Sequence, residues 1–278
     1  MKHNLSVTLL LVALFFLAQL IGVFILDQYV TVERTIVDGE TIVAYEWVAL
    51  PYNLERPEFD EETSYLPLIL VILVATGLAL VLFRLKAFRL WKLWFFLSVL
   101  FCLLIAFNVF FSTAIALLVA LAFTILKIFK QNVYVHNFTE LFIYGGLAAV
   151  FVPILTIWSA SILLIAIAIY DAIAVWKTKH MVSLAKFQSK VKLFAGLMIP
   201  YKNGKHTAIL GGGDIGFPLL FTGAVMKTYG LSSLIISCFV TLSLLILLWL
   251  AEKNKFYPAM PFLAAGCFLG YGVLLLLV

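Results

Sequence analysis

Long apolar runs separated by short polar segments dominate this sequence of 278 residues. A helix needs ~20 apolar residues to cross a hydrocarbon core of ~30 Å. Five runs have about this length: residues 6–26, 65–83, 207–226, 231–250 and 258–278. The pattern predicts an all-α, polytopic membrane protein, and no polar stretch is long enough to form a separate soluble domain.

Two further apolar runs are too long for one crossing. Residues 93–126 would form a helix of ~50 Å at ~1.5 Å per residue, so we expect a break within residues 108–113. Residues 141–176 are expected to break at Pro153 and the polar residues 156–161. Dividing both runs gives nine transmembrane helices in one membrane-embedded unit, residues 1–278, with six helices before residue 177 and three after residue 206.

Charged residues, 12% of the chain, are distributed unevenly. Ten of the fourteen acids lie within residues 27–62, where Arg34 and Arg56 are the only bases, whereas residues 177–206 carry seven Lys and no acid. With the N-terminus inside, sixteen of the nineteen Lys and Arg residues are cytoplasmic, in accord with the positive-inside rule. We therefore expect loop 177–206 to be cytoplasmic and loop 27–64 to be extracytoplasmic. The net charge reports topology and does not indicate a nucleic-acid partner.

The two long loops carry weaker signals. Residues 29–32 and 35–37 are rich in Val, Thr and Ile and precede Asp38-Gly39, which favours a β-hairpin with an Asp-Gly turn. A disordered acidic loop is the alternative interpretation. Residues 182–198 mix apolar and basic positions, a pattern compatible with a segment lying along the membrane surface.

Asp171 and Asp214 are the acids placed well inside predicted membrane helices. A charged residue at that depth costs at least ~2.5–3.5 kcal/mol and indicates a functional site. Glu140, at the start of an apolar run, is interpreted as an interfacial residue. Asp171 precedes Lys177 by six residues and Asp214 follows Lys205 by nine, so both lie on the order of 10 Å inside the cytoplasmic boundary. Because consecutive helices run antiparallel, the two carboxylates can meet at one level.

Two carboxylates in contact do not both ionise easily, so they share a proton and can activate a water between them. This chemistry predicts an aspartyl protease that works inside the membrane. A buried polar pair that joins two helices is the structural alternative. A proton or cation pathway is the functional alternative, because buried acids on broken helices also build transporters. Transporters of that kind often contain internal repeats, and the sequence shows none.

The residues around the second acid favour a site. The glycines Gly211, Gly213 and Gly216 remove side chains, which allows a helix or a substrate strand to approach closely. Pro218 has no N–H to donate to the carbonyl four residues earlier, which loosens the helix there. At the start of the last helix, the two prolines of Pro258-Ala259-Met260-Pro261 also remove backbone donors.

The cysteine and histidine residues do not indicate a metal or a disulfide. The three Cys lie in apolar runs without a CxxC pair. The four His are scattered and lie outside the apolar cores: His3, His136, His180 and His206. We expect no metal site and no cofactor.

Three motifs together resemble a known family. Tyr170-Asp171, the Gly-x-Gly-Asp of residues 211–214 and the Pro-Ala-x-Pro of residues 258–261 occur in the order and on the helices typical of presenilin and signal peptide peptidase. The resemblance is greatest to the archaeal homologues, where Tyr-Asp is followed by a run like residues 177–181. Prepilin peptidases share Gly-x-Gly-Asp, but commonly with a nearby Lys that this chain lacks after the motif.

The resemblance implies a role for each motif residue. Asp171 and Asp214 would form the catalytic dyad, supported by Tyr170, Gly211 and Gly213. Substrate binding would fall to a second group, in which Gly212 and Met260 replace the Leu usual in the family: Gly212, Pro258, Ala259 and Met260. These two departures affect the expected cleavage-site preference more than catalysis.

The implied protein is an intramembrane aspartyl endopeptidase in a prokaryotic, archaeal cell membrane. Its substrates would be transmembrane helical peptides of single-span membrane proteins or remnant signal peptides, and its surroundings membrane lipid. The sequence does not identify the oligomeric state.

Overall fold

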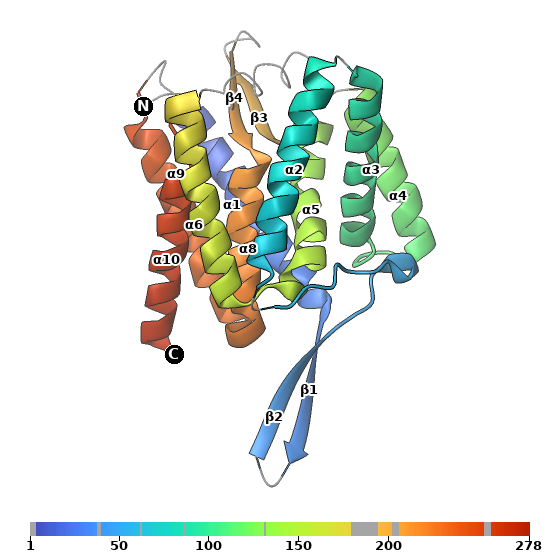
Figure 1. Ribbon diagram of the computed structural model, residues 1–278, viewed down its shortest axis with the longest axis vertical. Helices are drawn as coiled ribbons and strands as arrows, with labels where there is room; N and C mark the ends of the chain where they lie inside the picture. Colours follow the sequence, from blue (N-terminus) through green and yellow to red (C-terminus); the bar gives the residue numbers. More distant parts are fainter. Residues whose placement is uncertain are drawn as a thin grey trace.

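The apolar runs form a bundle of roughly parallel helices in a computed structural model (Figure 1). The structure describes residues 4–37, 40–61, 63–85, 87–130, 132–178, 194–201, 206–252 and 257–278. The helices before the basic loop are α1 (Leu5–Gln28), α2 (Tyr65–Arg84), α3 (Phe88–Phe107), α4 (Thr113–Ile125), α5 (Val133–Phe151) and α6 (Ile157–Ile173). Those after it are α8 (Gly212–Tyr229), α9 (Leu234–Leu250) and α10 (Met260–Leu277).

Both predicted helix breaks are confirmed. A short turn separates α3 from α4 between Phe107 and Thr113, and a 3₁₀ turn, Val152–Ile154, separates α5 from α6. Within the described ranges, seven helical spans are long and apolar enough to cross a membrane. One of them, Gly212–Leu250, contains both α8 and α9, and a shorter apolar helix covers Tyr65–Ala79. These spans make the chain an integral, multi-pass membrane protein, whereas the count of nine crossings stays a prediction.

Helix α5 begins eight residues earlier than the apolar run that predicts it. Asn132 caps its first turn, because the Asn132 side chain accepts a hydrogen bond from the Tyr134 N–H. Two polar residues of the second helical turn, Thr139 and Glu140, are fully buried, so the interpretation of Glu140 as interfacial is wrong. His136 is buried as well, so the placement of all four His outside the core is also wrong.

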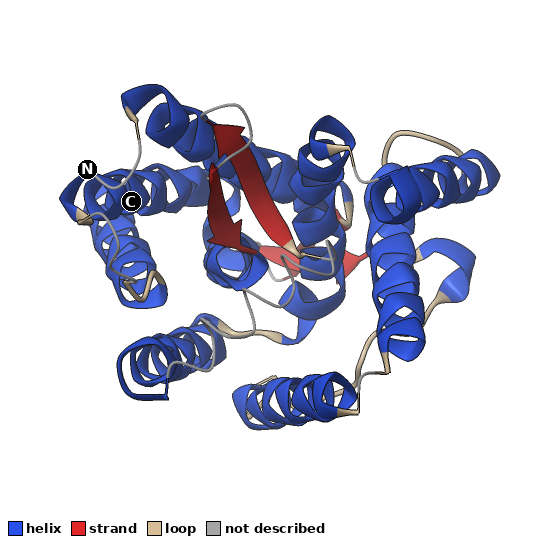
Figure 2. Ribbon diagram, turned by 90° about the horizontal axis from the view of Figure 1, so that it is seen from above, coloured by secondary structure: helices blue, strands red, loops and turns tan. Residues whose placement is uncertain are grey.

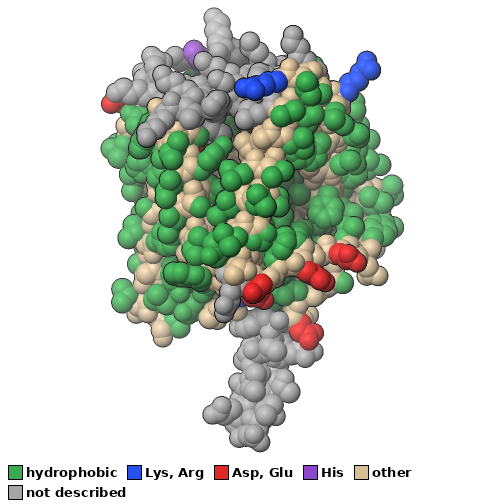
Figure 3. Space-filling view, in the orientation of Figure 1, with side chains coloured by type: hydrophobic (Ala, Val, Ile, Leu, Met, Phe, Trp, Pro, Cys, Tyr) green, Lys and Arg blue, Asp and Glu red, His purple; other side chains and the backbone are tan. Residues whose placement is uncertain are grey.

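The acidic loop forms the predicted hairpin. Strands β1 (Val30–Val37) and β2 (Glu40–Trp47) pair antiparallel from Val30–Trp47 to Val37–Glu40 and project beyond one end of the bundle (Figure 1). The Asp38-Gly39 turn lies outside the described residues. On the face shown in Figure 3, most of the acidic side chains gather beside this end, and basic side chains lie at the opposite end.

A second hairpin replaces the expected start of the seventh helix. Strands β3 (Gly196–Tyr201) and β4 (His206–Gly211) pair antiparallel, from Gly196–Gly211 to Tyr201–His206. Residues 207–211 are therefore strand and not helix, and residues 196–198 are strand and not a surface segment. The remainder of the 182–198 prediction lies mainly outside the described residues, as does most of the seven-lysine loop. Seen from above, β3 and β4 lie over the middle of the bundle (Figure 2).

Helices α1 and α8 pack together in the interior. Gly22 of α1 accommodates the Leu219 side chain of α8, and Gly223 of α8 accommodates side chains of Val152 and Leu26. Such small-residue contacts let membrane helices approach closely. Most of α8 after its first turn is buried, so the segment that carries the Gly-x-Gly-Asp motif is enclosed by its neighbours.

Candidate active site

Asp171 lies near the C-terminal end of α6, on its buried face, with 7% of the residue exposed. Its Oδ2 accepts a hydrogen bond of 3.1 Å from the backbone N–H of Met260, and the Ala259 N–H donates to the same carboxylate. Ala259 is the N-cap of α10. The first N–H groups of a helix lack partners within it and carry partial positive charge. Asp171 therefore binds the N-terminus of α10 as an anion would.

Asp214 is the third residue of α8, whose N-cap is Gly211. The Gly211 N–H donates to the Asp214 carboxylate, the backbone half of a capping box. A negative side chain in the first turn also interacts favourably with the helix dipole. The Gly-x-Gly-Asp sequence thus begins a helix and places its own carboxylate at the positive end.

The structure brings Asp171 and Asp214 close enough for their charges to interact. They come from α6 and α8, which contact each other, and α10 contacts both helices. Two helix N-termini, those of α8 and α10, thus converge on one pair of carboxylates. This arrangement places partial positive charge beside both carboxylates, and two carboxylates whose charges interact do not both ionise easily.

The three glycines before Asp214 lie in different surroundings. A Cβ at Gly211 would lie 3.2 Å from Asp214 Oδ2, so the lack of a side chain there leaves room for the carboxylate. A Cβ at Gly212 would lie 2.8 Å from the Tyr144 hydroxyl, so Gly212 has a packing reason to be glycine. Gly213 is exposed, and a Cβ there would meet only the Phe217 ring, at 3.4 Å or more. Of the three, Gly213 leaves open backbone beside the acid.

The remaining predicted site residues surround Asp171. Pro258 and Met260 are buried and Ala259 is half-buried, so this segment acts on Asp171 through its backbone. Tyr170 is half-buried on α6. The supporting role of Tyr170 and the substrate-binding roles of Gly212, Pro258, Ala259 and Met260 stay predictions.

Gln19 is a site neighbour that the sequence reasoning missed. This fully buried residue of α1 donates from Nε2 to the Ile215 carbonyl at 2.9 Å. The bond fixes the backbone next to Asp214. An amide in the middle of an apolar helix of 24 residues was the available signal, because burial of an amide requires a partner.

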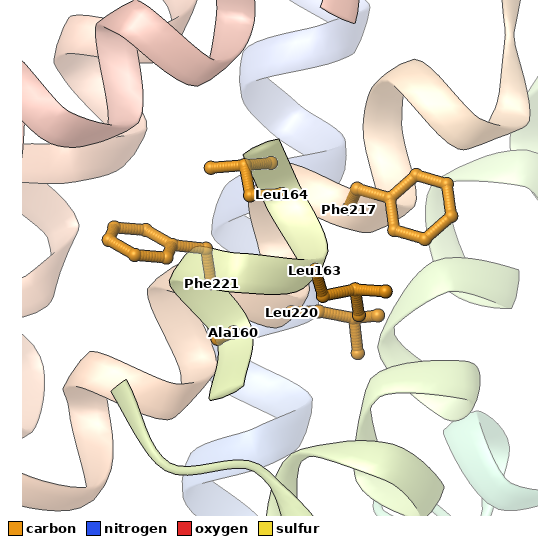
Figure 4. A pocket seen from close by; sticks show the side chains of 6 residues that line it. All are labelled: Ala160, Leu163, Leu164, Phe217, Leu220 and Phe221. Atoms are coloured by element: carbon orange, nitrogen blue, oxygen red, sulfur yellow. The ribbon is translucent and has the colours of Figure 1, made fainter. Parts of the chain in front are cut away.

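A small apolar pocket lies between α6 and α8 (Figure 4). Leu164, seven residues before Asp171, and Phe221, seven after Asp214, are among its lining residues. The pocket is therefore about two helical turns, ~10 Å, from the aspartates on the same two helices. Its lining contains no titratable side chain, so it offers apolar contact and no catalytic group.

Fold and site together define the class: a multi-pass helical membrane protein in which two helices bring a pair of carboxylates together. Residues 51–278 match the family model described as signal-peptide peptidase, presenilin aspartyl protease, and the chain belongs to this family. The prediction of an aspartic-type, intramembrane-cleaving protease is thereby confirmed.

Two solved structures share the fold. Both are described as a presenilin family intramembrane aspartate protease, one in space group C222 and one in P2. The first has a TM-score of 0.66 at 22% identity and covers 98% of this chain and 99% of its own. The second has a TM-score of 0.64 at 20% identity and covers 96% and 97%. None of the curated proteins compared with the chain matches it.

Proposed function

We propose that the protein hydrolyses peptide bonds within transmembrane segments of single-span membrane proteins or remnant signal peptides, with Asp171 and Asp214 as its catalytic pair. The observation that carries the proposal is the convergence of these two carboxylates, each at a helix N-terminus, inside a membrane bundle. Family membership supports the reaction type. The substrate class and the catalytic role of each acid go beyond family membership and are part of the proposal.

In the proposed mechanism, one carboxyl is protonated and the other is ionised. The ionised carboxylate takes a proton from a water held between the two, while the protonated one donates to the oxygen of the scissile amide. The backbone N–H groups at the starts of α8 and α10 stabilise the charge that remains on the pair. No covalent intermediate is formed.

Strand β4 is the proposed docking edge for an extended substrate. In the described residues the sheet has two strands, so each has one outer edge. The outer edge of β3 is occupied by α5, because Asn137 exchanges two hydrogen bonds with Met198, of 2.8 and 3.0 Å. The antiparallel register then points the backbone N–H and carbonyl groups of Thr207 and Ile209 away from β3, whereas the Gly211 N–H is already bonded to the Asp214 carboxylate. A substrate strand added there would reach Asp214 directly.

The charge distribution sets the proposed orientation in a prokaryotic cell membrane. The N-terminus and loop 177–206 are cytoplasmic, and loop 27–64 is extracytoplasmic. The gathering of acids and bases at opposite ends of the bundle on the visible face supports this assignment (Figure 3).

The test is cleavage of a transmembrane test substrate by the purified protein in liposomes. Asp171→Asn and Asp214→Asn should each lower the rate by about 10³-fold or more, in the range of general acid–base contributions. A shared proton also predicts a bell-shaped dependence of the wild-type rate on pH. Glu58→Gln, which neutralises an exposed acid at the far end of the bundle, is the matched control and should leave the rate unchanged.

An aspartyl-protease transition-state analogue should bind the wild type and lose affinity in both Asn variants. Substantial proteolysis by either single Asn variant would refute the catalytic pair. Proton flux without cleavage, abolished by the same substitutions, would instead establish the transport alternative.

A further inference from the structure

A buried polar cluster joins the end of α4 to α5. Lys127 lies in the π-helical segment Leu126–Lys130 and is 4% exposed; Glu140 of α5 is 0% exposed. Lys127 Nζ and Glu140 Oε1 are 2.7 Å apart. Replacing a buried ion pair by apolar residues of similar volume is often neutral or stabilising, so packing alone does not call for these charges.

Every donor and acceptor at the centre of this cluster has a partner. Besides Glu140, the Lys127 ammonium donates to Thr139 Oγ1 at 3.0 Å and to His136 Nδ1 at 3.2 Å. Because an ammonium group has no acceptor, Nδ1 must accept, and the His136 proton is on Nε2. His136 Nε2 lies 2.7 Å from the Gly196 carbonyl, to which it donates. One neutral tautomer of His136 therefore satisfies both contacts.

The cluster holds both polar groups of Gly196, the first residue of β3. Glu140 Oε2 accepts from the Gly196 N–H at 2.9 Å, and His136 binds the Gly196 carbonyl. Gly196 has φ +133°, and a Cβ there would collide with the Leu210 carbonyl of β4. This position requires glycine. The strand thus starts at a point that α5 fixes from one side and β4 from the other.

From Gly196 the contacts lead to the catalytic helix. Gly196 pairs with Gly211, and the adjacent Ala195 carbonyl accepts from the Gly212 N–H at 3.0 Å. The Tyr144 hydroxyl donates to Glu140 Oε2 and lies against Gly212. Glu140 is therefore connected to Gly212, the first residue of α8, by two routes: through β3 and through Tyr144. Asp214 lies two residues after Gly212 in the same helical turn.

We propose that Glu140, with Lys127 as its counter-charge, is a positioning residue for Asp214. Its Oε2 fixes the start of β3 and the first turn of α8, and so sets the place at which Asp214 faces Asp171. The expected effect on kcat rests on the proposed function. The placement of β3 and of the first turn of α8 by Glu140 does not depend on that function.

Two double variants separate positioning from charge. Lys127→Met with Glu140→Gln removes both charges but keeps a side-chain acceptor for Gly196 and Tyr144. Lys127→Met with Glu140→Leu removes both charges and the acceptor. Since the two double variants share the Lys127 change and leave no orphan charge, their difference isolates the acceptor.

The Gln pair should keep kcat within about threefold of wild type, whereas the Leu pair should lose about tenfold or more in kcat with KM within twofold, because small displacements of a catalytic group cost this much. Glu61→Gln, which breaks the exposed Lys227–Glu61 pair of 3.0 Å at the opposite end, controls for loss of an ion pair and should leave kcat unchanged. Equal kcat in the two double variants, or a loss confined to KM, would overturn the proposal.

Amide hydrogen exchange without substrate gives a readout independent of proteolysis. The Leu pair should exchange about tenfold or more faster than the Gln pair at Gly196 and at residues 211–214, with equal exchange in α9. Unchanged exchange at these amides would refute the positioning role. If the wild type failed to cleave any substrate while this exchange difference persisted, the proposed function would fail and the positioning inference would hold.

Discussion

At the scale of single residues, backbone N–H groups hold both carboxylates of the site. Asp171 takes its hydrogen bonds from Met260 and Ala259, and Asp214 takes one from Gly211. A donor that belongs to the backbone persists when the side chain is changed. Substitutions in the Pro-Ala-x-Pro segment should therefore affect packing before they affect the dyad.

Met260 tests this expectation, because its side chain is 3% exposed although the family resemblance gives it a role in substrate binding. Met260→Leu conserves volume and should cost less than about 1.5 kcal/mol. Met260→Ala should destabilise by about 2–5 kcal/mol through the cavity that it leaves. Thermal unfolding measures both changes.

Cleavage assays on the same two variants distinguish packing from substrate contact. With the Met260 N–H retained, we expect KM and the cleavage position to stay unchanged for Leu and Ala. A shifted cleavage position in either variant would show that the side chain contacts substrate.

The sequence predicted the two acids but not what surrounds them. Asp171 and Asp214 are conspicuous because each lies in an apolar run, where the free-energy cost of inserting a charge can be seen from the neighbouring residues alone. Glu140 was wrongly interpreted as interfacial because its counter-charge, Lys127, lies 13 residues earlier in the chain and in another helical segment. One local signal was present: His136, Glu140 and Tyr144 recur every four residues and so form a polar stripe on one face of α5.

At the scale of elements, the β3–β4 hairpin is the feature that hydropathy could not reveal. The run of residues 207–210 is short and largely apolar, and such a run is equally compatible with a strand and with a buried helix. The choice is made by tertiary contacts, in which β3 pairs with β4 on one edge and with α5 on the other. By contrast, the long helices and their two breaks follow from run length and polar interruptions alone.

The contact between α5 and β3 gives the second prediction. Asn137→Ala leaves the N–H and carbonyl of Met198 without their partner, which should cost about 1–3 kcal/mol and speed hydrogen exchange in β3. Asn132→Ala, at the N-cap of the same helix, should cost about 1 kcal/mol without changing exchange in β3. Equal exchange in the two variants would show that Asn137 does not hold the strand.

At the scale of the whole molecule, two of the bases that depart from the positive-inside rule are held by hydrogen bonds to the bundle. Arg56 and Lys227 are two of the three bases predicted to be extracytoplasmic. Arg56 donates to the Val48 and Ala149 carbonyls, at 2.7 and 3.1 Å. Lys227 pairs with Glu61 and donates to the Pro153 carbonyl at 2.9 Å. Both thereby fasten the acidic loop to the bundle, a role that accounts for bases on that side.

The predicted topology determines which substrates fit. With the N-terminus inside, α6 runs toward the cytoplasm and α8 returns, so a strand added to β4 should come from a segment whose N-terminus is outside. Two reporters with one transmembrane sequence inserted in opposite directions measure the preference. We expect cleavage of the reporter with its N-terminus outside to be at least about tenfold faster, equivalent to ~1.4 kcal/mol. Equal cleavage, or preference for the reverse reporter, would contradict the assignment.

The β1–β2 hairpin has a practical consequence for work on this protein. Each strand has eight residues and spans about 26 Å at ~3.3 Å per residue, so the hairpin extends well past the end of the bundle (Figure 1). An antibody fragment raised against it would bind the protein at the end opposite to β3 and β4 and would leave the starts of α8 and α10 uncovered. Such a fragment would serve as an orientation marker for single-particle imaging, and its binding to intact cells would report which end of the protein faces outward.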